Sequence, residues 1–217
     1  MKFTKDPAEQ TTAITDLILA LVASCGIFFI RWPAMNNSDL WKMNIWSAAF
    51  GLIGLAAALG FVAHGLVLSQ GLHHRVWLVL NLTLALAVSL FVVAVVYDLC
   101  DVAVSLRVLP IMLTAGLGFY LATLLYPGIF FVFIVFEMLS LFFALAAYVY
   151  LAVQGGLSGA GLMAVGILLS IIAAGIQANK SVAVAIIWKF DHNGFYHIIQ
   201  MIGLLFLFAG LRYSLSG

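Results

Sequence analysis

Long apolar runs dominate this sequence, and they restrict the folds that it can adopt. A helix that crosses a bilayer needs about 20 mostly apolar residues, and the chain holds seven runs near that length. They cover residues 14–30, 45–68, 76–97, 108–126, 129–153, 162–178 and 194–211. Hydrocarbon cannot form hydrogen bonds with exposed backbone groups, so only helices and closed barrels can cross the membrane. The runs predict an all-α, polytopic membrane protein with seven transmembrane helices in one bundle, a single domain over residues 1–217.

The composition agrees with a membrane protein and excludes some partners. Hydrophobic residues make up 65% of the chain and charged residues 8%, whereas a soluble domain has about 45–50% and about 25%. The net charge of +1 predicts no nucleic-acid partner. Membrane lipid is the expected partner. Small residues such as Gly51 and Gly54 favour close helix contacts, so a helix-packing protein or a second copy of the chain is a further candidate.

Three segments between the runs need separate interpretation. The apolar piece 182–188 is too short to span, so we expect it to be interfacial or to continue the sixth helix. His73 and His74 lie in a turn after the second run, where we expect them to be exposed. Asp98 and Asp101 bracket the loop after the third run, and their expected role is that of solvated helix ends.

All five histidines of the chain fall on one side of the predicted bundle. We call the side where the first helix starts side A and the opposite side B. Odd-numbered helices begin on side A, and even-numbered helices end there. The polar residues that this scheme places at side A are Asp16, His64, His73, His74, His192 and His197.

The lysines and arginines give a small bias in orientation. The positive-inside rule counts these residues in short loops. Side A holds Lys2, Lys5, Arg75, Lys180 and Lys189, and side B holds Arg31, Lys42, Arg107 and Arg212. The bias predicts a cytoplasmic N-terminus in an integral protein of the plasma or inner membrane.

The densest polar stretch, Asp191 to Gln200, opens the seventh run. Asp191 or Asn193 is placed to cap the seventh helix. Asn193, His197 and Gln200 share one helix face because they are spaced by four and three residues. His192 and His197 are about 140° apart on a regular helix. They can share a metal only if His192 precedes the helix.

Other polar residues lie inside the apolar runs, where they are costly and usually face a bundle interior. Glu137 is deep in the fifth run, so it is either a functional carboxyl or a structural bond to another helix. His64 is either a packing histidine or a functional one. Gln177 and Asn81 are expected to face the same interior.

Seven spans, His64 late in the second and a histidine cluster opening the seventh resemble the CREST superfamily. That group includes the alkaline ceramidases and the progestin and adipoQ receptors. The resemblance implies a seven-helix bundle that hydrolyses lipid amides and holds zinc with three histidines. By position, His64 matches the ligand on the second helix and His197 matches the second histidine of HxxxH on the seventh. Asp16 is similar to the acidic residue at the head of the first helix.

The chain departs from the family pattern at three positions. Asn193 stands at the first histidine of HxxxH, with His192 one residue earlier. Gly60 stands where the family has a serine. The aspartate expected early in the third helix is absent, and Asn81 is the nearest polar residue.

The first functional hypothesis is a zinc-dependent hydrolase that acts on a lipid amide or ester. Zinc bound by His64, His192 and His197 would activate water and polarise a carbonyl. Asp191 or Asp16 would orient a ligating histidine or accept a proton.

Two other functional classes remain open. The missing serine and aspartate favour a non-catalytic bundle, either receptor-like or a subunit of a membrane complex. A transporter or proton relay through Glu137, His64 and His197 is the third hypothesis, and the lack of an inverted repeat argues against it.

Overall fold

The computed structural model describes residues 2–32, 40–126, 131–179, 181–185 and 188–216, and seven helices account for most of them. Each helix is long and apolar enough to cross a membrane, which confirms the predicted all-α seven-helix bundle and makes the chain an integral membrane protein. The helices are α1 (Pro7–Arg31), α2 (Leu40–Gly65), α3 (Gln70–Leu99), α4 (Val102–Leu125), α5 (Phe131–Gln154), α6 (Ala160–Ala178) and α7 (His192–Ser214).

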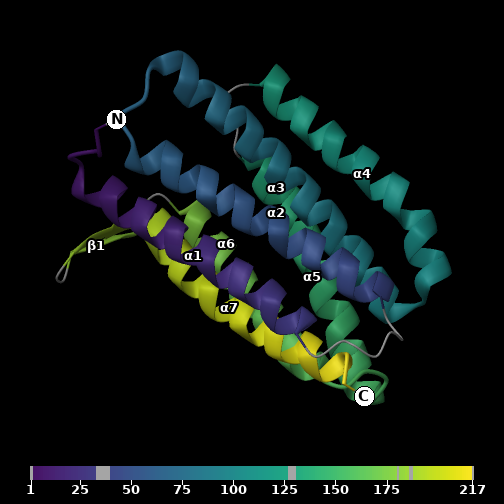
Figure 1. The fold of residues 1–217 in the computed structure, drawn as a ribbon. Coiled ribbons are helices and arrows are strands. Elements are labelled where there is room, and N and C mark those ends of the chain that lie inside the picture. The colour runs from purple at the N-terminus through teal and green to yellow at the C-terminus, as the bar shows by residue number, and fades with distance from the viewer. Residues whose placement is uncertain (1, 33–39, 127–130, 180, 186–187, 217) are drawn as a thin grey trace.

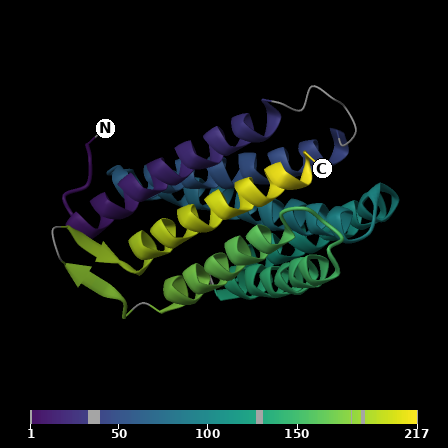
Figure 2. The same cartoon turned by 90° about the horizontal axis from the view of Figure 1, so that it is seen from below.

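The helices pack mainly in chain order. α1 contacts α2, α2 contacts α3, α3 contacts α4, α5 contacts α6 and α6 contacts α7. α1 also packs on α7, and α3 on α5, so the bundle encloses an interior (Figure 1). α4 is outermost, with only 6% of its most apolar stretch buried. The two termini lie at opposite ends of the bundle, as an odd number of crossings requires (Figure 2).

Several helices begin in polar sequence, before the apolar runs. α1 starts at Pro7, where the Asp6 side chain accepts a hydrogen bond from the Ala8 backbone N–H at 2.9 Å. An aspartate cap followed by proline is a common helix start. α3 begins at Gln70, so His73 and His74 lie in its first turns and the turn predicted there is wrong. Hydropathy marks where a helix crosses the membrane, and the helix itself continues further.

The short apolar piece after α6 forms a strand. β1 (Ala183–Ala185) pairs antiparallel with β2 (Lys189–Asp191), with Ala183 opposite Asp191. The hairpin lies at the side-A end of the bundle (Figure 2). α6 ends at Ala178, so the expectation that the piece continues the sixth helix is wrong. Valine and aromatic residues in and around the hairpin favour extended backbone. Residues 186–187 lie outside the described residues.

Two pairs of glycines bring α6 and α7 close together. A Cβ at Gly166 would lie 2.7 Å from the Gly203 carbonyl oxygen, and one at Gly203 would lie 2.9 Å from the Gly166 oxygen. Gly159 and Gly210 form the second pair, where a Cβ at Gly210 would lie 2.7 Å from the Gly159 oxygen. Small residues permit this approach between membrane helices. The contact fixes the position of α7, which carries His197.

The N-terminal segment folds back along the end of α2. The Thr4 N–H donates to the Gly65 carbonyl at 2.8 Å, and the Val67 N–H donates to the Lys2 carbonyl at 2.9 Å. Phe3 and Leu66 form a bridge between these bonds. The segment before α1 is therefore tied to the side-A end of the bundle.

A buried ion pair joins three helices near side B. Lys42 Nζ of α2 lies 2.6 Å from Asp98 Oδ1 of α3, with side-chain exposures of 2% and 0%. The Tyr148 hydroxyl of α5 donates to Asp98 Oδ2 at 2.6 Å. The expectation that Asp98 is a solvated helix end is wrong, because α3 continues through it and turns its side chain inward. Asp101 instead caps α4 by accepting from the Val104 N–H at 2.8 Å.

Candidate functional site

A cavity of about 730 Å³ lies inside the bundle and is lined by residues from all seven helices. That volume is within the usual range for small-molecule sites. At side A its lining includes exposed His74 and half-buried His192 and Asn193, so the cavity reaches the surface at that end. The sequence-predicted residues that line it are Asp16, His64, Asn81, Glu137, Gln177, His192, Asn193, His197 and Gln200.

The lining changes from polar to apolar along the bundle. On α7 the lining residues run from His192 through His197 and Gln200 to Leu204 and Leu207. This spans about 22 Å at the rise of an α-helix. The polar residues are at the side-A end, and only apolar residues follow Gln200. The cavity thus has a polar end and an apolar end, as an amphiphilic molecule does.

Asp16 and His197 form a buried pair where the two halves of the cavity meet. His197 Nε2 lies 3.1 Å from Asp16 Oδ1, and the two residues are 6% and 3% exposed. On α1 the next lining residue is apolar Leu19, and on α7 only Gln200 separates His197 from apolar Leu204. The pair therefore stands at the boundary between the polar and apolar halves.

Hydrogen-bond counting places a proton between these two side chains. His197 Nδ1 lies 2.9 Å from Thr15 Oγ1, which is also within 2.9 Å of the Thr12 carbonyl oxygen. If Thr15 donates to His197, then Nε2–H donates to Asp16. If Thr15 donates to the carbonyl, Nδ1 carries a proton, and the Nε2 contact needs a second proton on His197 or one on Asp16. Each arrangement leaves Asp16 and His197 bridged by a proton.

Gly60 provides the space that Asp16 occupies. A Cβ at position 60 would lie 2.6 Å from Asp16 Oδ1 and 2.7 Å from Oδ2. Any side chain there would displace the carboxyl group from its present position. This packing accounts for the glycine at position 60.

A second acid–histidine pair lies nearer side A. His64 Nδ1 is 2.7 Å from Glu9 Oε2, and the His64 ring meets Trp77 edge-on at 5.6 Å. His64 and His197 both line the cavity. Sequence reasoning missed Glu9 because it precedes the first apolar run. Its spacing of seven residues from Asp16, about two helical turns, was the available signal.

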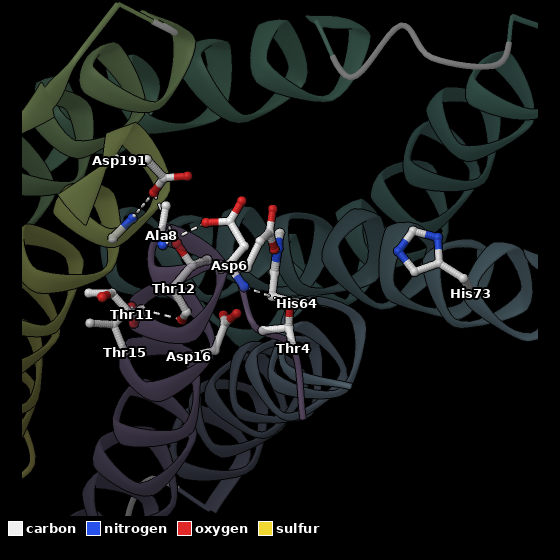
Figure 3. Close-up of polar contacts among 12 residues, drawn as sticks. Thr4, Asp6, Ala8, Thr11, Thr12, Thr15, Asp16, His64, His73 and Asp191 are labelled. Atoms are coloured by element: carbon white, nitrogen blue, oxygen red, sulfur yellow. Dashed lines mark hydrogen bonds and ion pairs between the residues drawn. The ribbon is translucent and has the colours of Figure 1, made fainter. Parts of the chain in front are cut away.

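Asp191 is placed outside the cavity lining and holds two elements together. Its Oδ1 accepts from the Gly194 N–H and from the Thr12 hydroxyl, both at 2.9 Å (Figure 3). Asp191 is therefore the N-cap of α7, and the alternative cap, Asn193, does not have this role. The bond from Thr12 also ties α7 to α1. His73 stands apart from the cluster (Figure 3).

Four buried oxygen atoms in the cavity wall have no hydrogen-bond partner among the described residues. They are Asp16 Oδ2, Asn81 Oδ1, Glu137 Oε2 and Gln200 Oε1. An unsatisfied buried acceptor costs about 1–3 kcal/mol. These atoms are available to a ligand or water molecule that offers hydrogen-bond donors.

The side chains as arranged do not fit zinc with three histidine ligands. Both ring nitrogens of His197 already have partners, and His64 Nδ1 contacts Glu9. In the described ranges, no group of three or more His, Cys, Asp or Glu side chains is placed to hold a metal ion.

Zinc remains a sequence-based prediction, and elemental analysis of protein purified without chelator tests it. About one equivalent per chain would support the prediction and would require His197 to release Thr15 or Asp16. Trace amounts would contradict it.

Fold and site together define a class: a seven-helix integral membrane protein with an acid–histidine pair facing an internal cavity. The chain belongs to a family of unknown function, DUF6962, whose model matches residues 11–216. That match contains every residue that lines the cavity. No curated protein and no solved structure gives a significant match.

Proposed function

We propose that this protein is an intramembrane hydrolase that acts on an ester or amide of a single-chain lipid. The observation that carries the proposal is the Asp16–His197 pair at the boundary between the polar and apolar halves of the cavity. A lipid with its head group toward side A would place the bond between head group and acyl chain at this boundary. The proposal rests on this coincidence of polarity and chemistry.

Asp16 is the proposed general base. Its Oδ1 contacts His197, and its Oδ2 has no partner and lines the cavity wall. A water molecule held by Oδ2 would attack the carbonyl carbon while its proton passes to Asp16. The proton then goes to the leaving nitrogen or oxygen as the bond to the acyl carbon breaks. His197 is a positioning residue that holds Oδ1.

Amide side chains complete the proposed chemistry. Gln200 and Asn81 line the cavity, and each carries an NH₂ group that can donate to the oxygen of the attacked carbonyl. Donors aimed at a developing oxyanion commonly make a large contribution to acyl transfer. Gln200 lies one helical turn from His197, on the same face of α7.

The test is hydrolysis of single-chain lipids by the purified protein in lipid nanodiscs. Monoacylglycerols, lysophospholipids and N-acyl ethanolamines are supplied separately, and released fatty acid is measured by mass spectrometry. We expect release from at least one class, above that from nanodiscs without protein. Absence of release from every ester and amide would overturn the proposal.

A non-catalytic lipid-binding protein is the second candidate. This candidate is favoured because both ring nitrogens of His197 already have hydrogen-bond partners. Asp16 Oδ2 is then the one atom of the pair without a partner. The same experiment separates the candidates. A lipid that co-purifies with the protein and is never cleaved would indicate binding alone.

A further inference from the structure

The apolar half of the cavity ends on a cluster of aromatic side chains. Phe50 and Phe91 line the cavity, and Trp46 packs behind them with ring centroids 5.3 Å and 5.7 Å away. Phe208 of α7 meets Phe50 edge-on at 4.6 Å. Trp46 is 0% exposed and Phe50 is 1% exposed. This aromatic floor separates the cavity from Lys42 and the rest of side B.

The distance from Asp16 to the aromatic floor matches one leaflet of a bilayer. Gly60 touches Asp16, and Phe50 lies further along the same helix by about 15 Å at the α-helical rise. The hydrocarbon core of a bilayer is about 30 Å thick, so one leaflet takes about half of that. An extended acyl chain that begins at Asp16 would therefore end near Phe50 and Phe91.

Small side chains shape the wall at the level of the floor and just above it. Ala49 of α2 lies one turn from Trp46, and Ala87 of α3 lies one turn from Phe91. Both alanines line the cavity and are buried, at 1% and 3% exposure. Because protein interiors are close-packed, a larger side chain at either position would take space from whatever fills the cavity.

We infer that Ala49, Ala87 and the aromatic floor set the length of the acyl chain that the cavity accepts. The ligand is a lipid with one acyl chain, whose terminal carbons rest on Phe50 and Phe91. The unpartnered, buried Asp16 Oδ2 at the other end of this space supplies the polar contact. This inference rests on the lipid ligand of the proposed function and does not require hydrolysis.

The experiment compares chain-length preference in wild type, Ala49→Leu and Phe91→Leu. Binding of a homologous series of saturated monoacylglycerols, from shorter to longer than one leaflet, is measured with the protein in detergent. Leucine adds three carbons to alanine, so we expect Ala49→Leu to shift the preferred chain shorter by about three carbons. Phe91→Leu opens the floor and shifts the preference toward longer chains.

A neighbouring residue provides a matched control. Ala48 precedes Ala49 on α2, is exposed on the outer face and does not line the cavity. Ala48→Leu should keep the wild-type preference. Ala87→Leu provides a second filled wall, on a different helix, if Ala49→Leu fails to fold.

The outcomes distinguish this inference from the proposed function. An unchanged preference in folded Ala49→Leu and Ala87→Leu would overturn the inference even if wild type hydrolyses lipids. A shifted preference without any hydrolysis would support the inference and contradict the hydrolase. If wild type binds no member of the series, the inference is overturned, whereas the proposed function fails only if none of the esters and amides in the nanodisc assay is cleaved.

Discussion

Lys42→Met is expected to lower the free energy of unfolding by about 3–5 kcal/mol, the usual cost of removing one partner of a buried ion pair. Lys42 Nζ is 2.6 Å from Asp98 Oδ1, and the Asp98 side chain is 0% exposed. Methionine fills much of the lysine volume, so the loss comes from the charge left behind on Asp98. The measurement is denaturant or thermal unfolding of purified protein in one detergent.

The matched variants separate charge from packing. Lys5 is exposed, and Lys5→Met should change stability by no more than about 0.5 kcal/mol. Replacing the whole network with Lys42→Met, Asp98→Leu and Tyr148→Phe should restore much of the loss, because apolar replacements of buried ion pairs are often tolerated. A Lys42→Met protein as stable as wild type would show that the ion pair contributes little.

Asp16→Asn is expected to lower lipid hydrolysis by about 10²–10⁴-fold, the usual contribution of a general base. Asparagine keeps the shape of aspartate and one oxygen, but its amide cannot take the proton of the attacking water. Because the substitution is nearly isosteric, the cavity should still bind the lipid. The measurements are fatty-acid release and lipid binding on the same preparation.

Asp6→Asn is the control for this substitution. Asp6 is exposed and caps α1 through the Ala8 N–H, and asparagine caps helices about as well as aspartate. It should therefore hydrolyse lipid at the wild-type rate. If Asp16→Asn also retained that rate while remaining folded, Asp16 would not be the base.

The architecture could be predicted because the bilayer fixes how long an apolar helix must be. Every apolar run corresponds to one helix of the structure. The helix starts were harder, because α1 and α3 extend into polar sequence where hydropathy carries no signal. For α1, the sign in the sequence was the cap at Asp6 followed by Pro7. For the hairpin after α6, the only sign was a set of residues that favour β-strands.

Sequence reasoning gathered the polar residues at one end of the bundle but did not pair them. Which side chains meet depends on how each helix is rotated about its axis. An amphipathic helix reveals this rotation, whereas a helix that is apolar all round does not. The expected grouping was His64, His192 and His197, whereas the contacts found are Asp16 with His197 and Glu9 with His64. The Lys42–Asp98 pair was missed for the same reason.

The backbone bonds between residues 2–4 and 65–67 affect how the protein should be handled. They hold the N-terminal segment against the end of α2, next to His64. Glu9 lies in the first turn of α1, which follows this segment. An affinity tag or fluorescent reporter joined to that segment would stand at the side-A end of the bundle, where the cavity reaches the surface. The C-terminal end of α7 is at the opposite end of the bundle. Tags for purification, surface immobilisation or single-molecule labelling therefore belong after Ser214.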